Sequence, residues 1–187
     1  QRLAKKGFEL AMTRTKKLCC VDKANVMETS RLWRETVQAM EKDYPEVTVS
    51  YEFVDAVAMR LVQWPNSYDV LITENLFGDI LTDEASVISG SMGLMPSASV
   101  GEHTSLYEPI HGSYPQATGL NIANPLATVL SAAMMFEDAF GLTEEAAAIR
   151  AVVNKSLEEG YVTEDLAAKG APTYGTKEVG DWLVANL

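Results

Sequence analysis

The chain has 187 residues with 15 basic and 26 acidic side chains, which gives a formal net charge of −11 at pH 7. Apolar residues make up 47% of the chain and charged residues 22%, values typical of a globular protein rather than a disordered one. The acidic balance counts against nucleic acid as the main partner, but a few local cations or one metal ion would still allow an anionic substrate.

The first residues, Gln1-Arg2-Leu3-Ala4, read as part of a helix that is already under way, and no initiator methionine precedes them. They lack the charged and apolar regions of a signal peptide, and no apolar run in the chain is long enough to span a bilayer. We therefore expect a cytoplasmic protein with no membrane partner, of which this chain is one piece. A processed or engineered terminus is the alternative.

Helical and strand patterns alternate over the first half of the chain. Apolar residues at helical spacing predict helices, and short apolar or alternating runs predict strands. The run that ends at Thr73 is almost wholly apolar, as expected for a strand inside a parallel sheet. Ser30 is expected to cap the second helix. The predicted helices are 2–11, 29–43, 55–62 and 77–89, and the predicted strands are 18–21, 47–53 and 69–73.

The segment 90–125 is rich in Gly, Pro, Ser and His and shows no sustained helical period, so we expect a long functional loop. The sequence then predicts helices again, at 127–140, 143–159 and 176–186. The first of these is apolar nearly all round and should be buried. Thr143 is expected to cap the second.

Cys19 and Cys20 are adjacent in an apolar stretch, with no spacing suited to a disulfide or to zinc. We expect two buried thiols in a strand of a reduced protein.

Asp79 and Asp83 are the strongest candidates for a site. They follow the buried strand that ends at Thr73, and on a helix they lie one turn apart on the same face. Two like charges there repel each other unless a cation lies between them, and carboxylate oxygens suit Mg²⁺ or Mn²⁺. The alternative is a solvated acidic helix face.

Asp55 and Lys23 each follow the end of a predicted strand. Asp55 could be a third metal ligand, or simply the N-cap of the next helix. Lys23 lies beside Asn25 and could accept a proton near a carboxylate site, although a surface lysine is the simpler interpretation.

A polar loop, 108–115, offers the imidazole of His111 and the backbone N–H groups of Gly112 and Ser113, which suit a phosphate or an adenine. Asn124 could bond the edge of a base, or only cap a structural turn. Other cofactor and catalytic motifs are absent: there is no Gly-x-Gly-x-x-Gly after a strand, no Walker A motif, no Gly-x-Ser-x-Gly and no zinc pattern.

Taken in order, these segments resemble the C-terminal half of the isocitrate/isopropylmalate dehydrogenase family, over essentially the whole chain. The isopropylmalate branch is the more similar, on the evidence of Ser97-Ala98-Ser99 and of Ile122-Ala123-Asn124-Pro125. The other motifs that carry the resemblance are Val21 to Val26, Val54 to Ala56, Asn75 to Asp83, Gly93 to Pro96 and Glu108 to Pro115.

The resemblance implies an α/β fold that is not a Rossmann fold, with mixed sheets flanked by helices, present here as a fragment. Residues 1–90 would belong to the smaller, dimer-forming domain, and residues 91–187 would be the C-terminal part of the larger cofactor-binding domain. It also implies a homodimer whose active sites are shared between protomers.

The implied chemistry is NAD-dependent oxidative decarboxylation of a branched malate, (2R,3S)-3-isopropylmalate, in leucine biosynthesis. By resemblance, Asp79 and Asp83 hold Mg²⁺ or Mn²⁺ together with Asp55 of the partner, and the partner's Lys23 helps to remove the hydroxyl proton. His111, Gly112, Ser113 and Asn124 would hold the adenosine part of NAD, with Glu108 nearby.

Gln116 stands where the NAD-preferring pattern has an aspartate. It can accept hydrogen bonds from ribose but does not repel a 2′-phosphate; since no Lys or Arg is nearby, we expect NAD rather than NADP. The family's N-terminal half, with the arginines that clamp the substrate, is missing, so we expect this chain to be inactive alone. The alternatives are another family member, acting on tartrate, D-malate, homoisocitrate or isocitrate, and a non-catalytic fragment that dimerises and binds metal.

Overall fold

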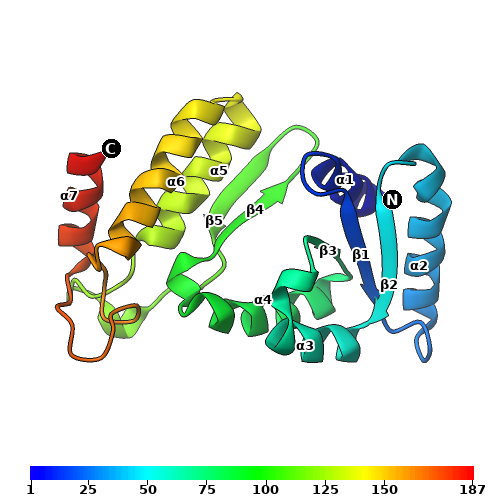
Figure 1. Ribbon diagram of the computed structural model, residues 1–187, viewed down its shortest axis with the longest axis horizontal. Coiled ribbons are helices and arrows are strands. Elements are labelled where there is room, and N and C mark those ends of the chain that lie inside the picture. Colours follow the sequence, from blue (N-terminus) through cyan, green and yellow to red (C-terminus); the bar gives the residue numbers. More distant parts are fainter. The chain divides into compact units, whose positions relative to one another are not determined.

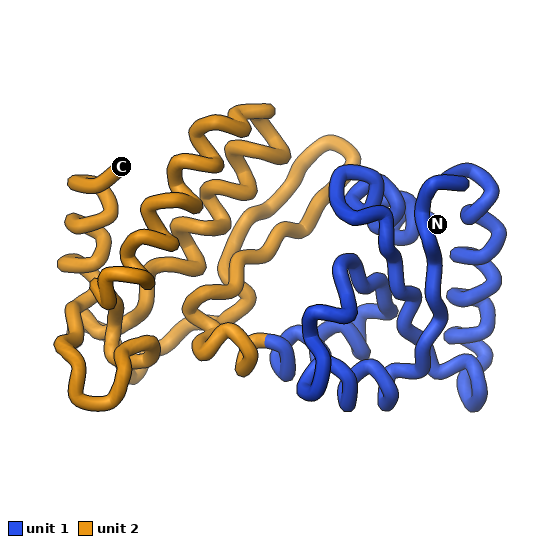
Figure 2. Tube along the Cα trace, viewed as in Figure 1, with its two compact units in different colours: residues 1–85 blue, residues 86–187 orange.

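The computed structural model describes residues 1–187, which divide into two compact units, residues 1–85 and 86–187 (Figure 2). The division falls close to the domain boundary predicted near residue 90. The roles predicted for the two parts, dimerisation and cofactor binding, stay predictions.

Unit 1 (residues 1–85) is built on a three-stranded parallel sheet (Figure 1). The central strand β1 (Lys17–Asp22) lies between β2 (Thr48–Phe53) and β3 (Val70–Ile72). The helices are α1 (Arg2–Met12), α2 (Glu28–Met40), α3 (Val54–Gln63) and the start of α4 (Asn75–Ser89). The predicted parallel arrangement is confirmed.

The core of unit 1 lies on both faces of this sheet, because alternate side chains of β1 point to opposite faces. Leu18 and Cys20 join one cluster and Cys19 and Val21 join the other. The two thiols are buried, as predicted. Burial raises the pKa of Cys19 to about 11 and that of Cys20 to about 12, so both stay protonated at neutral pH.

Unit 2 (residues 86–187) combines an antiparallel hairpin with three helices. The hairpin strands are β4 (Pro96–Val100) and β5 (Ser105–Pro109), and the helices are α5 (Leu126–Phe140), α6 (Thr143–Glu158) and α7 (Thr176–Asn186). The prediction of a loop throughout 90–125 is wrong for the hairpin. Its strands contain prolines and serines, which disfavour strands locally, and they are stabilised by pairing and by packing against α5.

Four short 3₁₀ turns complete the chain, at Glu41–Asp43, Pro65–Ser67, Met92–Leu94 and Pro115–Ala117. None of the helices has the length and apolar character needed to cross a bilayer.

Three predictions about helices are wrong. Ser30 does not cap α2: it lies buried inside that helix and donates a hydrogen bond to Glu74 Oε1 at 2.9 Å. Thr143 is the first residue of α6, and Leu142 is the N-cap. Only one stripe of α5 is buried, and Phe140 at its end is 60% exposed. The near-continuous apolar character of α5 therefore overstated its burial.

Candidate functional site

The polar residues singled out in unit 1 lie beyond the carboxyl ends of the parallel strands. Lys23 directly follows β1, Asp55 lies in the first turn of α3 after β2, and Asp79 lies in the first turns of α4 after β3. Open α/β sheets bind ligands at this edge, because the strand ends and the helix N-termini that follow them meet there. The topology thus gathers these positions at one edge of the sheet.

Lys23 and Asp55 are in direct contact. The Nζ of Lys23 donates a hydrogen bond to Asp55 Oδ1 and lies 5.8 Å from the centre of the Phe53 ring. The hydrogen bond from Lys23 lowers the pKa of Asp55. The N-cap of α3 is Phe53, and Asp55 is the second residue of the helix, in its first turn. The N-cap interpretation of Asp55 is therefore wrong, and Lys23 is a paired, partly buried side chain.

Asp79 and Asp83 lie one turn apart on α4, and both are exposed. No three His, Cys, Asp or Glu side chains of the chain form a group that could hold a metal ion. The structure thus brings Asp55 to Lys23, and it does not bring Asp55 into one cluster with Asp79 and Asp83 of the same chain. Two carboxylates at this spacing are oxygen donors of the kind that Mg²⁺ or Mn²⁺ prefers.

The residues predicted for the cofactor belong to unit 2. Glu108 lies on β5 opposite Ser97, and the Nδ1 of His111 lies 3.0 Å from the carbonyl oxygen of Gly112. Ser113 is exposed, as is Gln116 in the 3₁₀ turn Pro115–Ala117. A side chain added at Gly112 would meet nothing within 4 Å, so this loop borders open space.

Asn124 has a structural role. Its Oδ1 accepts a hydrogen bond of 3.0 Å from the backbone N–H of Leu126, and its Nδ2 donates one of 2.9 Å to Asp165. Gly93 packs so closely against it that an added Cβ would lie 2.7 Å from the Asn124 side chain. The interpretation of Asn124 as the cap of a turn is confirmed. Its contact with a cofactor stays a prediction.

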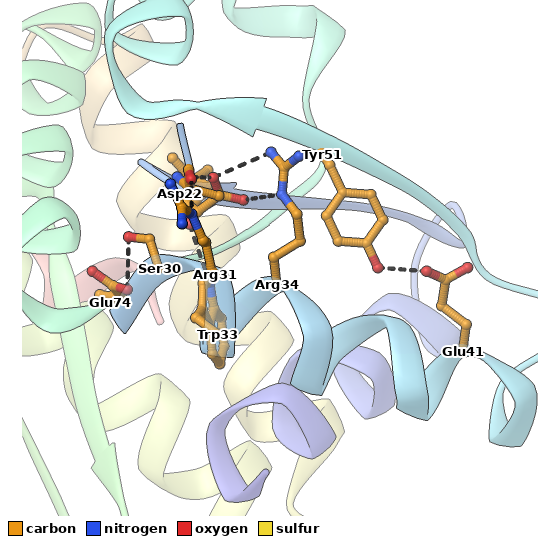
Figure 3. A network of polar contacts seen from close by, with 10 residues as sticks. Asp22, Ser30, Arg31, Trp33, Arg34, Glu41, Tyr51 and Glu74 are labelled. Carbon is orange, nitrogen blue, oxygen red and sulfur yellow. Dashed lines mark hydrogen bonds and ion pairs between the residues drawn. The ribbon is translucent and has the colours of Figure 1, made fainter. Parts of the chain in front are cut away.

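One feature near Lys23 was missed in the sequence. Asp22, the last residue of β1, has no exposed surface and pairs with Arg34 of α2 (Figure 3). Strand alternation places Asp22 inside, where a carboxylate needs a partner. Nothing in the sequence indicates that the partner stands twelve residues later.

Comparison with known proteins identifies the family of the chain. The family model described as isocitrate/isopropylmalate dehydrogenase matches residues 1–183. The chain is 58% identical over 184 residues to 3-isopropylmalate dehydrogenase of Bacteroides fragilis, covering 98% of this chain and 52% of that protein. It is 54% identical over 187 residues to the enzyme of the same name from Desulfitobacterium hafniense, covering 100% of this chain and 53% of that one.

Solved structures match as well. Isocitrate dehydrogenase from Methylococcus capsulatus superposes with a TM-score of 0.93 at 38% identity, covering 99% of this chain and 55% of that one. A β-decarboxylating dehydrogenase from Thermococcus kodakarensis gives a TM-score of 0.87 at 34% identity, covering 99% of this chain and 53% of that one. The chain spans about half the length of the relatives that it matches. It belongs to the isocitrate/isopropylmalate dehydrogenase family.

Proposed function

We propose that this chain is the C-terminal part of an enzyme that oxidises and decarboxylates 3-isopropylmalate with NAD and a divalent metal, a step of leucine biosynthesis. The observation that carries the proposal is the Lys23–Asp55 pair, which lies at the sheet edge where Asp79 also follows a strand. The names of the relatives with 58% and 54% identity support this substrate. We use the term complete enzyme for this chain joined to an N-terminal half like that of those relatives.

The metal would be held by Asp79 and Asp83, with Asp55 of a second protomer completing the set. The donor chemistry fits, because all three groups are carboxylates and hard divalent cations prefer oxygen ligands. A metal bound there would polarise the substrate hydroxyl and would stabilise the negative charge that remains when the carboxylate leaves as CO₂.

Lys23 and Asp55 act on the proton of the substrate hydroxyl. Asp55 accepts a hydrogen bond from the Nζ of Lys23 and so fixes the position of that nitrogen. Partial burial, with 25% of the Lys23 side chain exposed, limits the directions in which the amine can point. In its neutral amine form, Lys23 would take up the hydroxyl proton as the ketone forms, and bound NAD would supply the acceptor for the hydride.

The loop of unit 2 would bind the adenosine part of NAD. His111, Gly112 and Ser113 offer a ring and backbone N–H groups, Gln116 offers an amide toward ribose, and Glu108 lies near them in sequence. Without a cation at Gln116 to attract a 2′-phosphate, NAD remains the favoured cofactor.

A homodimer would complete the site. Met59 and Val62 follow Asp55 along one face of α3, and both are more than half exposed. Leu76 and Ile80, also more than half exposed, share one face of α4 with Asp83. The acids proposed for the shared site thus lie on apolar helix faces, which supports their meeting a second protomer.

The test is turnover by the complete enzyme with Mg²⁺. We expect isopropylmalate to be oxidised with NAD in preference to NADP and in preference to isocitrate. Lys23→Met should lower kcat about 100-fold or more, the usual scale for losing a proton acceptor, with a smaller change in the KM for NAD. Equal kcat/KM for isopropylmalate and isocitrate would refute the substrate assignment, and turnover by the 187-residue chain alone would refute the need for the N-terminal half.

A further inference from the structure

We propose that Arg34 is a positioning residue that acts through Asp22 to fix the turn carrying Lys23. The inference rests on the role proposed above for Lys23. It concerns two residues that touch neither substrate nor cofactor in that proposal.

Arg34 and Asp22 form an ion pair through two hydrogen bonds. One guanidinium occupies both oxygens of the buried Asp22 carboxylate: the Nε of Arg34 donates to Oδ2 at 2.7 Å and Nη2 donates to Oδ1 at 3.1 Å. A fork of two parallel hydrogen bonds fixes the orientation of a carboxylate as well as its charge. Asp22 therefore cannot rotate without breaking a bond in a buried position.

The fixed carboxylate of Asp22 in turn holds the backbone of the turn that carries Lys23. The Oδ1 of Asp22 also accepts a hydrogen bond of 2.8 Å from the backbone N–H of Ala24, which closes a turn across Lys23. On the other side, the carbonyl of Lys23 accepts bonds of 3.0 Å from the N–H groups of Val26 and Met27. The backbone of Lys23 is thus held from both directions, and one of the two anchors depends on Asp22.

Arg34 is itself held in place by aromatic rings. Its guanidinium lies 5.4 Å from the ring centre of Tyr51 and 5.3 Å from that of Phe53. The Tyr51 hydroxyl in turn donates to Glu41 (Figure 3). The Phe53 ring is also the one against which the Nζ of Lys23 lies. The Phe53 ring therefore lies close both to the Arg34 guanidinium and to the nitrogen proposed to act on substrate.

If the Asp22–Arg34 pair only stabilised the fold, restoring stability would also restore activity. If the pair positions Lys23, activity would stay low after stability is restored. Replacing a buried ion pair by apolar side chains of similar volume commonly restores stability, whereas removing one partner leaves an unpaired buried charge. The double variant Asp22→Leu/Arg34→Met would regain stability but would still lack the bond from Asp22 to Ala24. Arg34→Lys would keep the charge and lose the fork.

The experiment compares these variants in the complete enzyme. We expect Arg34→Met to lower both Tm and kcat. The double variant should recover most of the Tm while its kcat stays about tenfold or more below wild type, the scale of a displaced reacting group. Arg34→Lys should also lose about tenfold in kcat, with the KM for NAD within about twofold.

The control is Arg14→Lys, which changes another Arg–Asp pair of unit 1 and should leave kcat unchanged. Wild-type kcat in Arg34→Lys, or recovery of kcat together with Tm in the double variant, would overturn the proposal.

A second readout does not need activity. In the complete enzyme without substrate, hydrogen exchange at the Ala24 amide should speed up about tenfold or more in Arg34→Lys, while amides in the middle of β1 stay protected. An unchanged Ala24 amide would contradict the positioning role. If the wild-type complete enzyme does not oxidise isopropylmalate, the proposed function fails, and the exchange measurement still decides whether Arg34 holds the turn.

Discussion

Asp69 is an acid that folding makes stronger. Its Oδ2 accepts hydrogen bonds from the hydroxyl and the backbone N–H of Thr15, at 2.5 Å and 3.0 Å, and its Oδ1 accepts one of 2.6 Å from Arg14. These bonds hold the pKa of Asp69 at about 2, below its ordinary value of 3.8. The two bonds from Thr15 contribute most to this lowering. They join the turn before β1 to the residue that precedes β3.

This pKa predicts a pH dependence of stability. Because the folded pKa is the lower one, the unfolded chain takes up the proton first as the pH falls. The contribution of Asp69 is therefore complete above about pH 4 and is lost between about pH 4 and pH 2. Asp69→Asn should lower the urea midpoint at pH 7 and differ less from wild type as the pH approaches 2.

Urea titrations at several pH values between 2 and 7 measure this on an order-of-magnitude scale. Glu46→Gln is the control, because Glu46 belongs to an exposed pair with Lys16 and should change the midpoint little at any pH. A constant difference between Asp69→Asn and wild type across the range would show that ionisation of Asp69 is not involved.

The two thiols give a second residue-level prediction. At pH 8, a thiol with a pKa of about 11 is almost wholly protonated, whereas an unfolded cysteine with the ordinary pKa of 9.0 is ionised in about one molecule in ten. Native Cys19 and Cys20 should thus react with a thiol-specific reagent at least about 100 times more slowly than in urea. Asn66→Cys, in an exposed turn, should add one fast-reacting thiol, and fast labelling of the wild type would contradict the buried state.

At the residue scale, the sequence identified candidate site residues only where they directly follow the end of a strand. Lys23, Asp55 and Asp79 were identified because each follows a recognisable apolar run. The contact between Lys23 and Asp55 was not predicted from spacing, since it depends on β1 and β2 being neighbours. Arg34 was missed for the same reason: its partner is set by how α2 packs on the sheet.

At the element scale, unit 1 was predicted well because local pattern and tertiary packing agree there. β1 is buried on both faces, so its apolar run reports its environment directly. The hairpin of unit 2 offers no such signal. Pro96 and Pro109 face each other in its register, and its strands are only partly buried, so pairing and contact with α5 decide the conformation.

Two helical glycines distinguish packing from helix propensity. Gly7 is buried in α1, and an added Cβ would lie 2.3 Å from the Cγ2 of Ile72 on β3. Gly7→Ala should therefore destabilise unit 1 by about 1–3 kcal/mol, despite the better helix propensity of alanine. Gly180 lies in α7, where an added Cβ would meet nothing within 4 Å, so Gly180→Ala should stabilise by about 0.5–1 kcal/mol. Thermal unfolding measures both, and equal shifts would contradict the close approach of α1 to β3.

At the scale of the whole molecule, the acidic charge opposes self-association and the exposed apolar residues favour it. A chain with a net charge of −11 gains nothing from self-association by charge alone. Association of two copies therefore requires apolar contacts that outweigh the repulsion, or cations between the carboxylates. The exposed faces of α3 and α4 offer apolar contacts and also carry the carboxylates proposed to bind a cation. Val62 is 68% exposed and Ile80 is 55% exposed on these faces.

Placing a charge on either of these helix faces tests whether they form the dimer interface. Val62→Glu or Ile80→Glu should weaken the dimer of the complete enzyme by about 100-fold or more, because a carboxylate would be buried against an apolar surface that already carries acids. Since Lys23 and Asp55 are proposed to serve the partner's site, activity should fall with dilution in step with dissociation, measured by light scattering and by turnover at matched concentrations. Val184→Glu, on α7, is the matched control: Val184 is 79% exposed, and its change should alter neither property. A Val62→Glu variant that is monomeric yet fully active would exclude shared sites, and one that stays dimeric would exclude this face as the interface.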